Sequence, residues 1–151
     1  ISHDFHARRS GKETLPIMDA LDAEQERTGD AWQRALHGQC IYDRELIWFS
    51  YQRRGLYLEQ LQRYWQVIDR DQLYIDSSDR LFDDTAACLA DIFGFLGVDA
   101  EFRVPVQKSR GIATNKEALP DAVYERLRDY FREPNMQLFS ALDRDLRWNN
   151  P

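Results

Sequence analysis

One segment of this 151-residue chain has the composition of a β-strand, and it lies between two helical patterns. Gln72-Leu73-Tyr74-Ile75 is a short β-rich run bounded by Asp71 and by Asp76-Ser77-Ser78, and polar residues of this kind commonly flank strands. A single strand cannot satisfy its own backbone donors and acceptors in a core, and a helix-strand-helix unit expects a neighbouring parallel strand. The sequence therefore predicts an incomplete α/β domain whose other strands come from elsewhere.

Apolar spacing predicts the helices around this strand. Between Leu56 and Asp69 the apolar residues follow an amphipathic helical stripe, and a second helix is expected from the Asp83-Asp84 cap to Gly97. The first residue is Ile1 rather than Met, so we expect further sequence upstream. The other expected elements are the end of a helix over Ile1 to Arg9, a helix from Thr14-Leu15-Pro16 to Gly29, a connection with short helical turns from Asp30 to Ser50, an extended segment from Phe102 to Val106, and helices starting at Pro120 and Pro134.

Composition excludes several classes of function. With 43% hydrophobic and 13% aromatic residues, the chain can bury a sizeable core. A net charge of −6 and a pI near 5.1 argue against sequence-independent nucleic-acid binding and against an anionic membrane surface. Because Asp91 interrupts the longest apolar stretch, no transmembrane helix is expected.

The two cysteines, Cys40 and Cys88, show neither a disulfide pattern nor zinc-site spacing. We expect both to be free thiols, which favours a reducing compartment. The sequence therefore predicts a cytoplasmic location.

Three motifs are better explained by structure than by chemistry. Ser10-Gly11-Lys12-Glu13-Thr14 lacks the earlier glycine and the preceding strand of a phosphate loop, so we expect a turn followed by a Thr14 cap. His3 and His6 would share a helix face, but no third metal ligand is evident near them. The acidic pairs, Asp83 with Asp84 and Asp143 with Asp145, are expected to cap and solvate helix ends rather than to act as acid and base.

A basic loop stands out in this acidic chain. Between Gln107 and Glu117 lie the three cations Lys108, Arg110 and Lys116, with Gly111 beside them. An arginine offers a bidentate fork to an anion and a glycine permits close approach. The loop could therefore bind an anionic ligand, or it could simply be solvated.

Five segments, in this order, resemble motifs of one enzyme family. Ile1 to His6 with Ser10 to Leu15 resembles the family motifs Arg-x-x-Ser-x-x-x-His and Gly-x-Glu, and Arg54 to Tyr57 with Gln60-Leu61 and Tyr64-Trp65 resembles Gly-x-Tyr-x-x-x-Leu. Asp76 to Leu81 stands where the family has Glu-x-Leu, and Ile92 to Gly97 resembles its Phe-Leu-Gly helix end. Tyr130 to Leu138 with Asp145 to Trp148 resembles Tyr-x-x-x-Asn-x-x-Leu and the tryptophan near the family's end. The chain thereby resembles the carboxy-terminal half of the sulfotransferases, especially the heparan sulfate N- and O-sulfotransferases and their bacterial relatives.

The resemblance implies a P-loop-type α/β domain, a parallel sheet flanked by helices, of which residues 1–151 are a mostly helical carboxy-terminal part. It implies transfer of a sulfuryl group from 3′-phosphoadenosine 5′-phosphosulfate to a hydroxyl or amine of a small-molecule, glycan or lipid acceptor, without a metal. Ser2 matches the serine that contacts the cofactor's 3′-phosphate. Lys108, Arg110, Gly111 and Lys116 fall where the family closes over the nucleotide.

The same resemblance places the phosphosulfate loop, and usually the catalytic base, upstream of Ile1. We therefore expect this chain alone to hold about half a cofactor site and to be inactive. The absence of the animal enzymes' cysteine pair, Asp79 in place of the usual glutamate, and the short loop point to a bacterial-type relative with a different acceptor. The alternative is a non-catalytic helical interaction domain, in which the aromatic residues of the helical stripes, Tyr57, Trp65 and Tyr130, are simply core.

Overall fold

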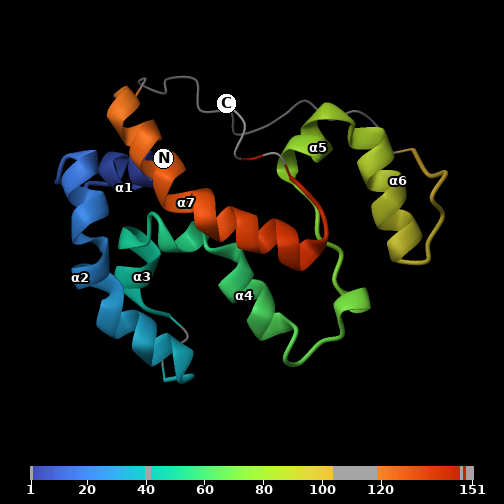
Figure 1. Ribbon diagram of the computed structural model, residues 1–151, viewed down its shortest axis with the longest axis horizontal. Coiled ribbons are helices and arrows are strands. Elements are labelled where there is room, and N and C mark those ends of the chain that lie inside the picture. Colours follow the sequence, from blue (N-terminus) through green and yellow to red (C-terminus); the bar gives the residue numbers. More distant parts are fainter. Residues whose placement is uncertain (1, 40–41, 104–118, 147, 149–151) are drawn as a thin grey trace. The chain divides into compact units, whose positions relative to one another are not determined.

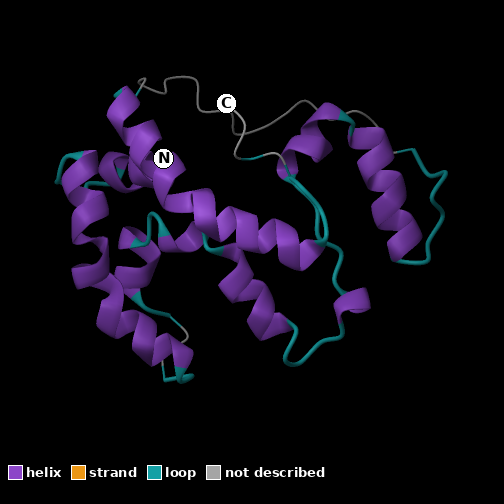
Figure 2. Cartoon of the chain, in the orientation of Figure 1, coloured by secondary structure: helices purple, strands orange, loops and turns teal. Residues whose placement is uncertain are grey.

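The computed structural model describes residues 2–39, 42–103, 119–146 and 148 (Figure 1). Within these ranges the regular structure consists of α-helices and two 3-10 turns, and no strand is present (Figure 2). The expectation of a mostly helical chain is therefore confirmed. Contacts divide the chain into two compact units. The first unit consists of Ile1–Gln60 and Asn115–Pro151, and the second unit is Leu61–Thr114.

The first unit begins with α1 (Ser2–Arg9) and α2 (Ile17–Leu36). The predicted end of α2 at Gly29 is wrong, because the helix continues for two further turns. A glycine inside a helix costs about 1 kcal/mol relative to alanine, but burial of Thr28 and Ala31 on either side outweighs that cost. The glycine that follows the end of α2 is Gly38, whose φ of +67° suits a helix terminus.

The predicted Thr14 cap is also wrong. The residue before α2 is Pro16, which provides no side-chain capping bond. Thr14 instead donates its backbone N–H to the carboxylate of Glu13. The Ser10-Gly11-Lys12 turn is present as expected, because the N–H groups of Gly11 and Lys12 return to the last carbonyls of α1.

The stretch predicted as a connection contains the end of α2 and the short helix α3 (Arg44–Phe49). Asp43 caps α3 by accepting bonds from the N–H groups of Glu45 and Leu46. The turn η1 (Arg53–Gly55) leads into α4 (Tyr57–Tyr64). The helix was predicted to reach Asp69 but ends at Tyr64. The apolar pattern after Tyr64 lies in turns, where the Ile68 N–H donates to the Tyr64 carbonyl.

The last helix, α7 (Asp121–Leu142), contains Pro134 in its interior. The prediction of a new helix at Pro134 is therefore wrong. Val123 is buried before the proline and Leu138 after it, so one continuous apolar face favours one continuous helix. Proline removes a backbone donor and crowds the carbonyl four residues earlier, and the α7 ribbon changes direction along its length (Figure 1).

The second unit contains η2 (Arg70–Gln72), α5 (Ser78–Asp83) and α6 (Thr85–Phe95). The predicted strand from Gln72 to Ile75 is not formed: Leu73 is extended, but the described residues offer no strand to pair with. The predicted cap is confirmed at Asp84, whose side chain accepts the Ala87 N–H, and α6 ends just before Gly97 as expected.

The basic loop from Gln107 to Glu117 and the end of the extended segment at Val106 lie outside the described residues. None of the described helices combines the length and apolar character that a membrane span requires.

Candidate functional site at the junction of α1, α2 and α3

The predicted 3′-phosphate residue Ser2 is the first residue of α1. It lies in the first turn that the structure describes for α1. Asp4 lies in this first turn, but the Arg8 guanidinium binds its carboxylate at 2.9 to 3.1 Å. The negative charge nearest to Ser2 within the helix is thus compensated by Arg8.

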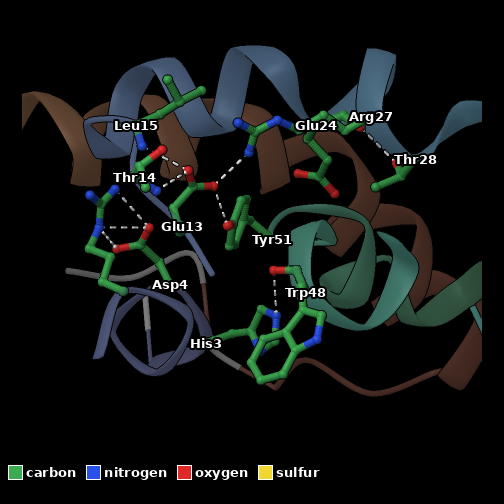
Figure 3. A network of polar contacts seen from close by, with 11 residues as sticks. His3, Asp4, Glu13, Thr14, Leu15, Glu24, Arg27, Thr28, Trp48 and Tyr51 are labelled. Atoms are coloured by element: carbon green, nitrogen blue, oxygen red, sulfur yellow. Dashed lines mark hydrogen bonds and ion pairs between the residues drawn. The ribbon is translucent and has the colours of Figure 1, made fainter. Parts of the chain in front are cut away.

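Glu13, in the segment between α1 and α2, is the buried centre of a polar network (Figure 3). Its side chain is 1% exposed. Oε1 accepts the backbone N–H groups of Thr14 and Leu15, each at 2.8 Å. Oε2 accepts a guanidinium N–H of Arg27 and the hydroxyl of Tyr51, each at 2.6 Å. One carboxylate therefore joins its own loop, α2 and the segment after α3.

These contacts fix the protonation states of the network. Burial works to raise the pKa of Glu13, but the hydrogen bonds from Tyr51, Leu15 and Arg27 outweigh it and lower that pKa to about 2. Burial and the adjacent Glu13 carboxylate both raise the pKa of Tyr51 above its ordinary value. At neutral pH the pair is therefore a carboxylate accepting from a neutral phenol.

The last carbonyls of α3 are satisfied from two sides. His3 Nε2 lies 3.1 Å from the Trp48 carbonyl oxygen, and Arg54 donates to the carbonyls of Leu46 and Ile47. Carbonyls at a helix end lack intrahelical partners. His3 in α1 and Arg54 in η1 thus supply the donors that α3 itself cannot.

His3 is held as a donor toward Trp48. Because a carbonyl oxygen can only accept, the hydrogen lies on Nε2. Burial, followed by the positive charge of Arg54, lowers the pKa of His3 below its ordinary value. The ring of Tyr51 lies 5.8 Å from the His3 ring, centroid to centroid. His3 therefore connects α3 with the aromatic ring whose hydroxyl binds Glu13.

His3 and His6 face the same neighbour, as their spacing predicts. The His6 ring stacks on Trp48 with centroids 5.9 Å apart and planes inclined by 14°, and Lys12 Nζ lies 6.0 Å from the Trp48 ring centre. Neither histidine belongs to a set of three or more metal-binding side chains in the described ranges. Both histidines are accounted for by packing against α3.

A second buried carboxylate, Glu24 of α2, binds the chain just after Tyr51. Its oxygens accept the backbone N–H groups of Gln52 at 2.7 Å and Arg53 at 2.9 Å, and the Gln52 side-chain amide at 3.3 Å. Glu24 therefore fastens α2 to the segment before η1, and these bonds do not involve α1.

The second unit contains its own polar cluster. Asp76 Oδ2 accepts from the Tyr74 hydroxyl at 3.0 Å and from Arg80 at 2.5 Å, and Arg80 also forms an ion pair with Asp91 of α6. Arg80 is thus shared by the two carboxylates of Asp76 and Asp91, and the cluster fastens the segment before α5 to α6. The buried thiol of Cys88 is free, as predicted, and lies 3.9 Å from Asp76 Oδ2.

Of the predicted site residues, only Ser2 lies in a described element. The residues predicted to close over the nucleotide, Lys108, Arg110, Gly111 and Lys116, fall outside the described residues. Glu13 belongs to the Ser10 to Thr14 motif, but its role in this network was not predicted from the sequence. Its side-chain partners Arg27 and Tyr51 lie 14 and 38 residues away, so no local spacing could have found them.

Comparison with models of known protein families, with curated proteins and with solved structures finds no match for this chain.

Proposed function

We propose that this chain is part of a sulfotransferase that moves a sulfuryl group from 3′-phosphoadenosine 5′-phosphosulfate to a hydroxyl or amine. The observation that carries the proposal is that three motif residues occupy positions where the structure restricts which residue fits. Ser2 lies in the first described turn of α1, the buried carboxylate of Glu13 accepts four hydrogen bonds, and Gly55 lies where a β-carbon would collide with a ring. These three residues belong to segments that resemble the family in order and spacing.

The chemistry assigns this chain a binding role. In the transfer, the bond from sulfur to the phosphate oxygen of the donor breaks, and sulfur bonds to the acceptor oxygen or nitrogen, whose proton goes to a base. Such a reaction depends on positioning and on cationic stabilisation of the leaving bisphosphate. Ser2 and the first turn of α1 would hold the 3′-phosphate, with Lys108, Arg110, Gly111 and Lys116 closing over the nucleotide. The phosphosulfate loop and the base would lie upstream.

A nucleotide-binding measurement tests the proposal. Full-length protein is titrated calorimetrically with adenosine 3′,5′-bisphosphate, before and after Ser2→Ala and Arg110→Ala. We expect each substitution to weaken binding about tenfold, as loss of one charge-assisted hydrogen bond does. Asp83→Ala, a change in the second unit, serves as the control and leaves affinity unchanged. If both site variants bind the nucleotide with unchanged affinity, the assignment of Ser2 and Arg110 to the nucleotide site is wrong.

Upstream sequence separates the enzyme from a non-catalytic helical interaction domain. The enzyme requires a strand leading into a Lys-x-Gly-Thr/Ser-type loop, roughly a hundred residues or more before Ser2. An unrelated upstream region, together with no nucleotide binding by the wild-type protein, would overturn the proposed activity.

A further inference from the structure

The Glu13 network contains a buried carboxylate and a half-buried phenol that the proposed transfer does not use. We infer that the Glu13–Tyr51 pair is a positioning device, which holds α1 at both ends so that Ser2 in its first turn is fixed for the 3′-phosphate. This inference rests on the proposed function, because it concerns the same nucleotide site.

The pair first fixes the carboxyl end of α1. The backbone N–H groups of Lys12 and Glu13 both donate to the Ala7 carbonyl, at 2.9 and 3.2 Å, and Ala7 is fully buried. The Glu13 side chain is in turn held by Arg27 of α2 at 2.6 Å. Any rotation of the Glu13 backbone would therefore move the last turn of α1 against α2.

Tyr51 extends the same connection to the amino end of α1. Its hydroxyl binds Glu13 beyond the end of the helix, while its ring packs against His3 in the first turn (Figure 3). His3 is fixed again through its bond to the Trp48 carbonyl. His3 follows Ser2 directly in the chain, so the orientation of the first turn depends on Tyr51.

Burial makes this connection stringent. A buried carboxylate needs all of its donors, because a charge left short of partners is costly in a low-dielectric environment. The four donors to the Glu13 carboxylate come from three segments, so only one arrangement of these segments supplies all four. If the arrangement loosens, only a fraction of molecules present Ser2 correctly, and the apparent affinity for the ligand falls by that fraction.

The chain offers a matched control. Glu24 is also a buried carboxylate, and it accepts hydrogen bonds from the backbone N–H groups of Gln52 and Arg53, which follow Tyr51 in the chain. None of these bonds reaches α1. Glu24→Gln therefore removes a buried charge of the same kind without loosening the first turn, and separates a general loss of packing from a loss of positioning.

The test compares Glu13→Gln, Tyr51→Phe and Glu24→Gln in full-length protein, with circular dichroism confirming that each is folded under the assay conditions. Two quantities are measured: the dissociation constant for adenosine 3′,5′-bisphosphate, and amide hydrogen exchange of α1. We expect Glu13→Gln and Tyr51→Phe to weaken binding about tenfold and to accelerate exchange in α1 about tenfold. Glu24→Gln changes both by less than about twofold.

The outcomes distinguish this inference from the proposed function. If Ser2→Ala weakens binding but Glu13→Gln and Tyr51→Phe behave as Glu24→Gln does, the positioning role is overturned and the nucleotide site stands. If the wild-type protein does not bind the nucleotide, the proposed function fails. Hydrogen exchange then still tests whether the Glu13–Tyr51 pair holds α1: equal α1 exchange in all three variants overturns that role, and faster exchange in only the first two supports it.

Discussion

A β-carbon on Gly55 would lie 2.6 Å from Cε1 and 2.7 Å from Cζ of the Phe131 ring. Gly55 is the last residue of η1 and Phe131 belongs to α7. These two segments are far apart in the sequence, and they meet at Gly55, which has no side chain. Real β-carbons do not approach a ring so closely. The contact explains why glycine follows Arg54 in the Arg54 to Tyr57 segment.

Gly55→Ala is therefore expected to destabilise the protein, by about 1 to 3 kcal/mol in the free energy of unfolding. The ring of Phe131 must shift to admit the methyl group. Urea unfolding measures the effect, and the double variant Gly55→Ala with Phe131→Leu is expected to recover part of the loss because it removes the distal ring atoms.

Gly29→Ala is the control for that experiment. Gly29 lies within α2, where a β-carbon would meet only the Gln25 side-chain nitrogen at 3.4 Å. Alanine is the better helix former, so we expect a gain of about 0.5 to 1 kcal/mol. Destabilisation by both substitutions, or by neither, would contradict the role assigned to the Phe131 contact.

The charge of Glu13 makes stability depend on pH in a defined window. Its pKa is about 2 in the folded protein, below the value of about 4.3 for an unfolded glutamate. The carboxylate therefore stabilises the fold above about pH 4.3, and this contribution is lost as pH falls toward 2. The contribution is about 2 to 3 kcal/mol.

Glu13→Gln imitates the protonated group. We expect the difference in unfolding free energy between wild-type protein and Glu13→Gln to be largest near neutral pH and to shrink as pH falls through this window. Denaturant titrations at a series of pH values measure it. A difference that stays constant down to about pH 2 would show that the Glu13 charge contributes nothing.

Local signals in the sequence predicted local features. The Asp84 cap and the position of Gly97 after α6 depend on a few neighbouring residues, and both are confirmed. Helix continuation was not predictable in this way. Gly29 and Pro134 resemble breakers in the sequence, yet α2 and α7 pass through them because burial on both sides outweighs a local preference.

Features that depend on distant residues could not be predicted from the sequence, for a different reason. The run from Gln72 to Ile75 has strand composition, but pairing requires a partner that the described residues do not supply. The Glu13 network joins a loop to Arg27 and Tyr51 across 14 and 38 residues. The sequence shows the residue types at such a junction, and only the fold shows that they meet.

Pro134 lies inside α7, and its replacement is expected to stabilise the protein. Alanine restores an N–H that can donate to the Tyr130 carbonyl and removes the clash of the proline ring with it. Pro134→Ala is therefore expected to raise the free energy of unfolding by about 1 to 3 kcal/mol. Pro120→Ala, at the start of the same helix, is the control and is expected to cost up to about 1 kcal/mol. A loss of stability in Pro134→Ala would contradict this account.

Asp84 caps α6, and its neighbour Asp83 does not. The Asp84 side chain accepts the Ala87 N–H at 3.0 Å, whereas Asp83 is the last residue of α5. Asp84→Ala leaves that N–H without its acceptor, and such a loss costs about 1 kcal/mol. We expect exchange of the Ala87 amide, followed by NMR, to accelerate about fivefold in Asp84→Ala and to stay near the wild-type rate in Asp84→Asn, because asparagine also caps. Asp83→Ala removes the same charge one residue earlier and is expected to leave the rate unchanged. Equal acceleration in the two alanine variants would mean that charge, and not the capping bond, protects the start of α6.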